Sequence, residues 1–498
     1  MNAPRSPGAA GWPVTTPAPA GAEDTWLPRG ARLRVVTVIV AAFGPYLFAG
    51  FRTEQLAVYT TVLCTLPAIS PRLWIGRAFL LVFGIWAVSA AFVTINAGSV
   101  LVVGPYLPGS TLAGIENYVY PVAVLLLVAG WRSAGYNRTA LLELVCRTMV
   151  AALCVNSLIA AAQVLFDLSP ILQRFWDGGA AGTDTVAVLA FGNGRLSGIF
   201  NQPAEAGIAY SLGLFSAVYL FARPGRDRPI LLGIAVALMV TGGVLCVSKV
   251  FLLLGVPLAL WQTSRQGRLV RRLVAICAVL GVGYVIAMQA GLSQWRGGWM
   301  LSALLPNGGG GDGGDLATRY TAQRFGQSGI LKVGWNLVLD THPWFGYGAG
   351  GLTLPYDSSW TEALVVGGLV GVLLLALAVT VIVVAWLRGS PDRASPERPF
   401  AGAVIALAVG ATAGIPTFTA NRVGLLLWIL IGLLVLTASG RAGAGADAAV
   451  HAAAARLAVA GPAPGSARHP AGHSGVPGPA RDLPAPRSTE RRPATFVT

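Results

Sequence analysis

Residues 361–387 read TEALVVGGLVGVLLLALAVTVIVVAWL, a run in which the only charged side chain is that of Glu362. A helix needs about 20 mostly apolar residues to cross the hydrocarbon core of a bilayer. This run meets that length, and its one charge stands at its start. It therefore predicts a membrane-spanning helix, and similar runs recur through most of the chain.

The composition indicates the same class of protein. Of the 498 residues, 54% are hydrophobic and only 11% are charged, and the mean hydropathy is +0.65. Soluble domains carry roughly 25% charged residues. We therefore predict an all-α polytopic membrane protein with about twelve transmembrane helices. The expected helix ranges are 33–51, 55–70, 78–97, 117–131, 143–166, 204–222, 230–247, 250–262, 273–291, 361–387, 400–418 and 423–438.

The net charge of +15 does not indicate nucleic-acid binding, because the arginines are scattered in short clusters between apolar runs. Loops that carry an excess of arginine stay in the cytoplasm. Every second loop is arginine-rich, which places both chain ends in the cytoplasm. The arginines of these loops are Arg72, Arg77, Arg132, Arg138, Arg223, Arg226, Arg228, Arg265, Arg268, Arg271, Arg272, Arg388, Arg393 and Arg398.

The ends of the chain and two long loops divide it further. Residues 1–30 and 441–498 lack apolar periodicity, so we expect a disordered cytoplasmic N-terminus and a disordered basic cytoplasmic tail around a transmembrane domain at 31–440. Extracytoplasmic loops are expected at about 167–203 and 292–360. Loops of this length are usually functional or disordered. Within the membrane, Glu143 and Arg147 are spaced to form a local ion pair on one helix.

The first long loop ends in Arg195-Leu-Ser-Gly-Ile-Phe-Asn-Gln-Pro203, and Glu205 follows at the mouth of the next helix. A guanidinium beside a helix N-terminus favours an anion, because free backbone N–H groups and the helix dipole act together. The alternative is an interfacial arginine that binds lipid headgroups. The sequence leaves both interpretations of Arg195 open.

The second long loop carries cations, a glycine-rich turn and a polar stretch. Residues 316–339 suggest helices lying on the membrane surface, with Arg319, Arg324 and Lys332 as their cations. His342 comes next, and then Pro343-Trp-Phe-Gly-Tyr-Gly348. A polar stretch that includes Asp357, Trp360 and Glu362 leads into the helix at 361–387.

These stretches resemble the bacterial O-antigen ligase/polymerase family. The resemblance is carried by the pattern Arg-Leu-x-Gly-x-Phe-x-x-Pro at 195–203, by Pro-x-x-Gly-x-Gly at 343–348, and by a polar tetrad followed by a Gly-x-x-Gly helix at 357–371. Specific motifs of the family occur only in these two stretches. Over residues 30–440 the resemblance is one of general architecture.

The resemblance implies a GT-C-like glycosyltransferase of the bacterial cytoplasmic membrane. Such an enzyme transfers a polyprenyl-diphosphate-linked glycan on the extracytoplasmic face to build capsule, O-antigen or exopolysaccharide. It implies no metal and no cofactor. Implied partners are the lipid-linked glycan, the lipid bilayer, and a chain-length regulator and flippase of the same pathway, but no nucleic acid.

Two departures from the family pattern affect the expected chemistry. Ligases typically place a His-Asn pair where this chain has Asp357-Ser358-Ser359-Trp360, which favours a polymerase over an O-antigen ligase. The family's second-loop arginine usually lies closer to the glycine-rich turn than Arg324 does, and Lys332 is nearer to that place.

The expected site follows from what glycan transfer requires. Cations must stabilise the departing diphosphate, and a base must take the proton of the acceptor hydroxyl. We expect catalytic roles for Arg195, Arg319, Arg324, Asp357 and His342, and substrate binding by Glu205, Lys332, Glu362 and Trp360. The main alternative is a secondary transporter or a flippase of lipid-linked oligosaccharides. Transporters place ionisable groups and broken helices near the membrane midplane in two matching halves, and the sequence shows no such repeat.

Overall fold

The computed structural model describes residues 27–48, 51–69, 76–96, 110–176, 186–223, 229–265, 330–352, 356–389 and 395–436. All of these belong to one compact unit, Met1–Gly440. The predicted cytoplasmic ends at 1–30 and 441–498 lie almost entirely outside the described residues, as do Arg319 and Arg324.

Apolar helices make up nearly all of the described structure. They are α1 (Arg29–Ala41), α2 (Thr53–Thr65), α3 (Arg77–Ile95), α4 (Thr111–Ser133), α5 (Arg138–Leu165), α6 (Ser169–Trp176), α7 (Val186–Gly192), α8 (Pro203–Ala222), α9 (Pro229–Leu245), η3 (Phe251–Gly255), α10 (Val256–Ser264), α14 (Ile330–Thr341), α15 (Ser359–Arg388), α16 (Glu397–Ala411), α17 (Asn421–Ile431) and η5 (Gly432–Leu436), with a short 3-10 turn η1 (Leu66–Ala68) after α2.

Five of the described helices, α3, α4, α5, α8 and α15, are long and apolar enough to cross a membrane. Shorter apolar helices occupy 230–245, 251–264 and 422–436. These findings agree with an all-α membrane protein. Each of the twelve predicted ranges contains a helix except 273–291, which lies outside the described residues. Twelve spans and a GT-C-like architecture remain predictions.

The first predicted helix was too long. α1 ends at Ala41, and an antiparallel hairpin follows, formed by β1 (Tyr46–Phe48) and β2 (Phe51–Arg52). Pro45 explains the difference, because proline has no N–H and disfavours helical geometry in the residue before it. The Thr53 hydroxyl donates to the carbonyl of Ala41 (2.8 Å), which closes the hairpin against the end of α1.

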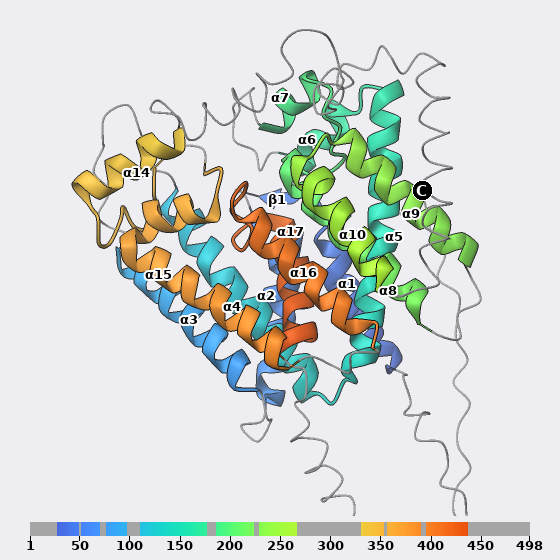
Figure 1. Cartoon of the computed structure of the whole chain (residues 1–498), viewed down its shortest axis with the longest axis horizontal. Coiled ribbons are helices and arrows are strands. Elements are labelled where there is room, and N and C mark those ends of the chain that lie inside the picture. The colour runs from blue at the N-terminus through green and yellow to red at the C-terminus, as the bar shows by residue number, and fades with distance from the viewer. Residues whose placement is uncertain are drawn as a thin grey trace, which may run out of the picture. The chain divides into compact units, whose positions relative to one another are not determined.

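The helices pack in two groups around a central pair. Figure 1 shows α3, α4 and α15 side by side, and α5, α8, α9 and α10 grouped on the other side, with α16 and α17 between them. α8 is buried along most of its length. Its many Ala, Gly and Ser residues permit close approach of neighbouring helices, as is common in membranes.

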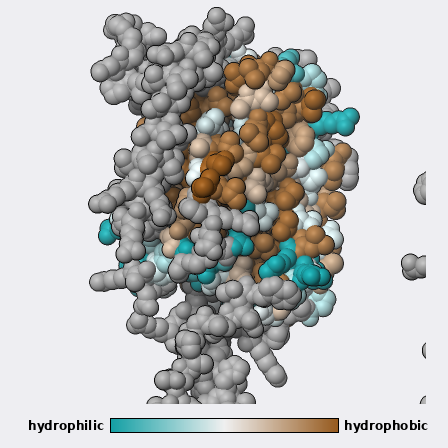
Figure 2. Space-filling view, turned by 90° about the vertical axis from the view of Figure 1, so that its right-hand side faces the viewer, coloured by the Kyte–Doolittle hydropathy of each residue, from teal (hydrophilic) through white to brown (hydrophobic). Residues whose placement is uncertain are grey.

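The two ends of the bundle differ in charge. At one end, α4 and α15 finish and α5 begins, beside Arg132, Arg388 and Arg138; we call it the arginine end. At the opposite end, the loop end, α8, α15 and α17 begin. Figure 2 shows a broad apolar face, with hydrophilic residues mainly toward its lower end. Which end faces the cytoplasm remains a prediction from the arginines.

Candidate active site

The sequence motif at 195–203 forms a tight turn at the loop end, which we call the Arg195 turn. Gly198 has a φ of 63°, a left-handed conformation that glycine adopts without steric cost. Two buried side chains of α5 accept hydrogen bonds from backbone N–H groups of the turn. Gln163 accepts from Gly198 N (2.9 Å), and Asn156 accepts from Ile199 N (2.9 Å). The Trp176 indole donates to the Gly198 carbonyl (2.8 Å). The motif therefore encodes a rigid turn.

Arg195 is half-buried at the start of this turn. Its Nη2 donates to the carbonyl of Val247 (3.4 Å), and the N–H of Leu196 donates to Leu245 (2.9 Å). Val247 has a φ of 47°, which is rare for a β-branched residue and indicates local strain. The guanidinium thus lies against the junction between α9 and η3, two residues before the half-buried Lys249. This arrangement brings two cations to one region of the loop end.

The second motif stretch contains a break in α15. Gly368 has φ 62° and ψ −156°, so the helix is interrupted there. The turn at 343–348 fills the interruption: Leu369 N donates to the Pro343 carbonyl (2.8 Å), and Tyr347 N donates to the Val365 carbonyl (2.7 Å). The freed backbone groups of the broken helix are therefore satisfied by the glycine-rich turn, as buried backbone requires in a membrane.

Glycine is needed on both sides of this contact. Gly346 has a φ of 63°, and a Cβ there would lie 2.6 Å from the Gly368 nitrogen. A Cβ at Gly368 would clash with the backbone of Trp344 and Phe345. Glycine is therefore required at positions 346 and 368 because two backbone segments approach each other closely there.

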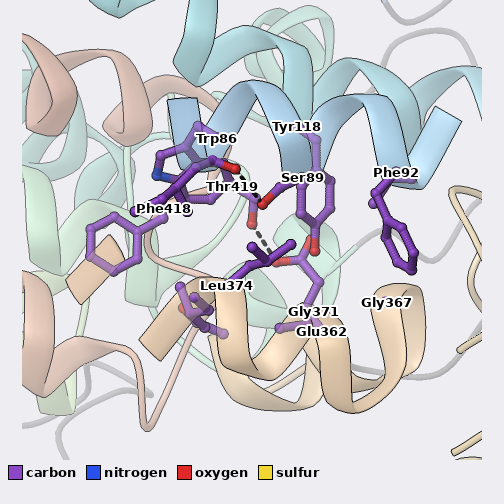
Figure 3. A pocket seen from close by; sticks show the side chains of 15 residues that line it. Trp86, Ser89, Phe92, Tyr118, Glu362, Gly367, Gly371, Leu374, Phe418 and Thr419 are labelled. Carbon is purple, nitrogen blue, oxygen red and sulfur yellow. Dashed lines mark hydrogen bonds between the residues drawn. The ribbon is translucent and has the colours of Figure 1, made fainter. Parts of the chain in front are cut away.

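A pocket lies between α3, α4 and the first half of α15. It is narrow and opens in part to the surroundings. Glu362, 6% exposed, points into it, and its carboxylate accepts a hydrogen bond from the Thr419 hydroxyl. Figure 3 shows Ser89 on α3 and Tyr118 on α4 facing the same space. The remaining lining is mainly apolar: Ile85, Trp86, Phe92, Val93, Ala363, Gly367, Gly371, Leu374, Leu375 and Phe418.

The other expected residues of the second loop lie around α14 and the start of α15. The Trp360 indole donates to the Thr412 hydroxyl (3.1 Å), so it packs rather than faces the pocket. Asp357 is half-buried just before α15. His342 is half-buried with its ring 5.0 Å from that of Tyr347, and Lys332 is exposed on α14.

Sequence reasoning missed a buried cluster of charges beneath the hairpin. Arg52, 5% exposed, forms ion pairs with Glu54 (2.7 Å) and with Glu116 of α4 (3.6 Å). Gln55 bridges the same groups, since it accepts from Arg52 N (2.6 Å) and donates to Glu116. The only signal in the sequence was one cation and one carboxylate, Arg52 and Glu54, in the short segment between two apolar runs.

Arg422 is the second functional candidate that the sequence did not single out. It is 2% exposed and donates to three backbone carbonyls: Gly44 (3.0 Å), Phe175 (2.8 Å) and Ile199 of the Arg195 turn. The next residue, Val423, donates its N–H to the Glu205 carboxylate (3.2 Å). Glu205 therefore holds the start of α17. Its carboxylate already binds the backbone there, although the sequence predicted that it binds substrate.

The turn between α16 and α17, together with the start of α17, links the two motif stretches. Thr419 of the turn binds Glu362, and Arg422 of α17 binds the Arg195 turn. Lys332 lies on α14, and the Arg195 turn follows α7. These two helices stand apart at the loop end in Figure 1, so the fold does not bring Arg195 and Lys332 together. No known family model matches this chain, and no curated protein matches it either.

Proposed function

We propose that this protein is a membrane glycan polymerase that transfers polyprenyl-diphosphate-linked repeat units at the loop end of the bundle. One observation supports the proposal most. The α16–α17 turn and the start of α17 contact both stretches that resemble the O-antigen ligase/polymerase family, through Thr419 on Glu362 and Arg422 on Ile199. Two motifs that are far apart in the chain thus share one end of the molecule and one connecting segment.

The proposed reaction divides the chemistry between the two stretches. The acceptor hydroxyl attacks the anomeric carbon, the bond to the diphosphate oxygen breaks, and its electron pair leaves with the lipid diphosphate. Arg195, with Lys249 nearby, stabilises this developing negative charge. The hydroxyl proton passes to a base of the second stretch, for which Asp357 and His342 are the half-buried candidates.

A secondary transporter is the second candidate, and the break in α15 favours it. Discontinuous helices that carry ionisable side chains form the substrate sites of many transporters. α15 is interrupted at Gly368, six residues after the buried Glu362. This alternative includes a flippase of lipid-linked oligosaccharides.

Reconstitution separates the two candidates. The purified protein in lipid nanodiscs receives a polyprenyl-diphosphate-linked repeat unit and no nucleotide sugar, and the products are resolved by size. A polymerase yields longer lipid-linked chains and free polyprenyl diphosphate. No chain growth, together with transbilayer movement of the same lipid in proteoliposomes, would establish the flippase instead.

A further inference from the structure

One face of α5 carries two buried amide side chains in a stretch, 150–165, that is mostly apolar. Asn156 and Gln163 are 1% and 5% exposed, although α5 is long and apolar enough to cross a membrane. They are seven residues apart and therefore lie on the same face of the helix. A buried amide is costly unless its polar atoms form hydrogen bonds. The partners of these two side chains therefore indicate their purpose.

Asn156 holds the Arg195 turn through two of its backbone groups. Its Oδ1 atom accepts from Ile199 N (2.9 Å), and its Nδ2 atom donates to the Ser197 carbonyl (3.3 Å). The same nitrogen donates to the Tyr210 hydroxyl of α8 (2.8 Å). One side chain thus ties the residues that follow Arg195 to two helices of the bundle.

The rest of this face of α5 fits the same turn. Gln163 accepts from the N–H of Gly198 (2.9 Å). Between the two amides, Ala160 packs against Leu196, the first residue after Arg195. A Cβ at Gly198 would collide with the Asn156 amide, so the turn lies directly on the helix. The conformation of the turn therefore depends on side chains of α5.

The place of the Arg195 guanidinium depends on this turn, because Arg195 leads directly into it. A charge stabilises a transition state only from the correct position, and a shift of about 1 Å can cost about a hundredfold in rate. Asn156 is itself buried behind the turn, so it does not contact a substrate that Arg195 holds. Any effect of its amide on catalysis must pass through the turn.

We propose that Asn156 and Gln163 are positioning residues for the transfer reaction, which act through the Arg195 turn and not on the substrate. The proposal rests on the proposed function, because it uses the role that Arg195 has there. Loss of the Asn156 amide frees two backbone groups of the turn. The guanidinium then no longer has one fixed place beside the departing diphosphate, and transfer slows.

A double-mutant cycle tests whether Asn156 acts through Arg195. Chain growth is measured in nanodiscs with the polyprenyl-diphosphate-linked repeat unit for Asn156→Leu, Arg195→Ala and the combined variant. We expect Asn156→Leu to slow chain growth by about tenfold in the wild-type background. Once Arg195 is alanine, the same substitution should slow it by less than about twofold. Effects that multiply in the combined variant would overturn the proposal.

Hydrogen exchange gives a readout that needs no activity. The amides of residues 196–200 should exchange at least about tenfold faster in Asn156→Leu than in the wild type, because Ile199 N loses its acceptor. Ser157→Ala is the matched control on α5. The Ser157 hydroxyl is buried next to Asn156 and donates to the Leu153 carbonyl of its own helix (3.0 Å), so its removal should change neither exchange nor chain growth.

A milder variant covers the case in which Asn156→Leu does not fold. Gln163→Met removes one acceptor of the turn and keeps an unbranched side chain of similar length, and its effect should depend on Arg195 in the same way. Unchanged exchange in both folded variants would overturn the proposal. Absence of chain growth in the wild type would refute the proposed function and the positioning role together. Multiplying effects in an active protein would refute the positioning role alone.

Discussion

The guanidinium of Arg422 donates a hydrogen bond to the carbonyl of Ile199, which lies 223 residues earlier in the chain. The same side chain also binds the carbonyls of Gly44 and Phe175. Aromatic rings of Tyr46 and Phe175 lie 5.7 and 6.0 Å from its charge. One buried arginine therefore holds the turn after α1, the end of α6 and the Arg195 turn against the start of α17.

Replacement of Arg422 should destabilise the fold. Arg422→Ala leaves three backbone carbonyls, that of Ile199 buried, without the guanidinium donor, and it removes a positive charge close to the buried carboxylate of Glu205. A buried charge network that loses one partner costs about 3–5 kcal/mol. Arg422→Lys should recover only part of this, because an ammonium cannot reproduce the planar fork. Thermal unfolding in detergent measures the effect. Arg388→Ala at the exposed end of α15 is the control. An equal loss of stability in both variants would contradict the structural role of Arg422.

The break in α15 gives a second stability prediction. Gly368→Ala forces a side chain into a conformation with φ 62° and against the backbone of Trp344 and Phe345. Such strain costs about 1–3 kcal/mol. Gly84→Ala, in open space on α3, should be neutral or slightly stabilising. Membrane abundance and unfolding temperature report both variants, and a fully stable Gly368→Ala would mean that α15 can run without interruption.

Local patterns predicted the local structure. The apolar runs predicted helices because the length that spans a bilayer is a property of each segment alone. The spacing of Glu143 and Arg147 predicted an ion pair, which is confirmed at 2.5 Å. Glu143 also binds Arg223 of another segment at 2.9 Å. That second contact depends on how α5 and α8 pack, so no spacing rule could supply it.

The candidate site was predictable only in pieces. The glycines at 346 and 368 were visible as a motif, but their contact with each other is a property of the folded chain. Arg52 and Arg422 received no predicted role, because sequence alone cannot separate an arginine in water from one that is buried among carbonyls. Polar side chains that stabilise distant turns leave no periodic signal.

The orientation of the bundle can be tested with reporters that are active only outside the cytoplasm. The arginine asymmetry predicts an active fusion after Gly313 and a silent one after Gly389, which follows Arg388 at the arginine end. The reverse pattern would place the pocket of Glu362 on the cytoplasmic side. That result would remove the proposed extracytoplasmic reaction together with the orientation.

Arg195 gives the most direct test of the proposed chemistry. Its guanidinium can hold two diphosphate oxygens at once, whereas lysine retains only the charge. We expect Arg195→Lys to be impaired in chain growth and Arg195→Ala to be slower by about a hundredfold, which corresponds to roughly 3 kcal/mol of transition-state stabilisation. The measurement is polymer length and rate, together with the amount of folded protein in the membrane.

The controls for Arg195 separate charge from position. Arg174 lies exposed on α6 in the same predicted loop, so Arg174→Ala removes a cation there without touching the Arg195 turn. It should leave chain growth within about twofold of wild type, as removal of an exposed charge usually does. Arg195 is half-buried in a turn and is not part of the hydrophobic core, so Arg195→Ala should also remain folded. Normal polymer from folded Arg195→Ala would identify Arg195 as an anchor for lipid headgroups, and the cations that stabilise the diphosphate would then have to be sought elsewhere at the loop end.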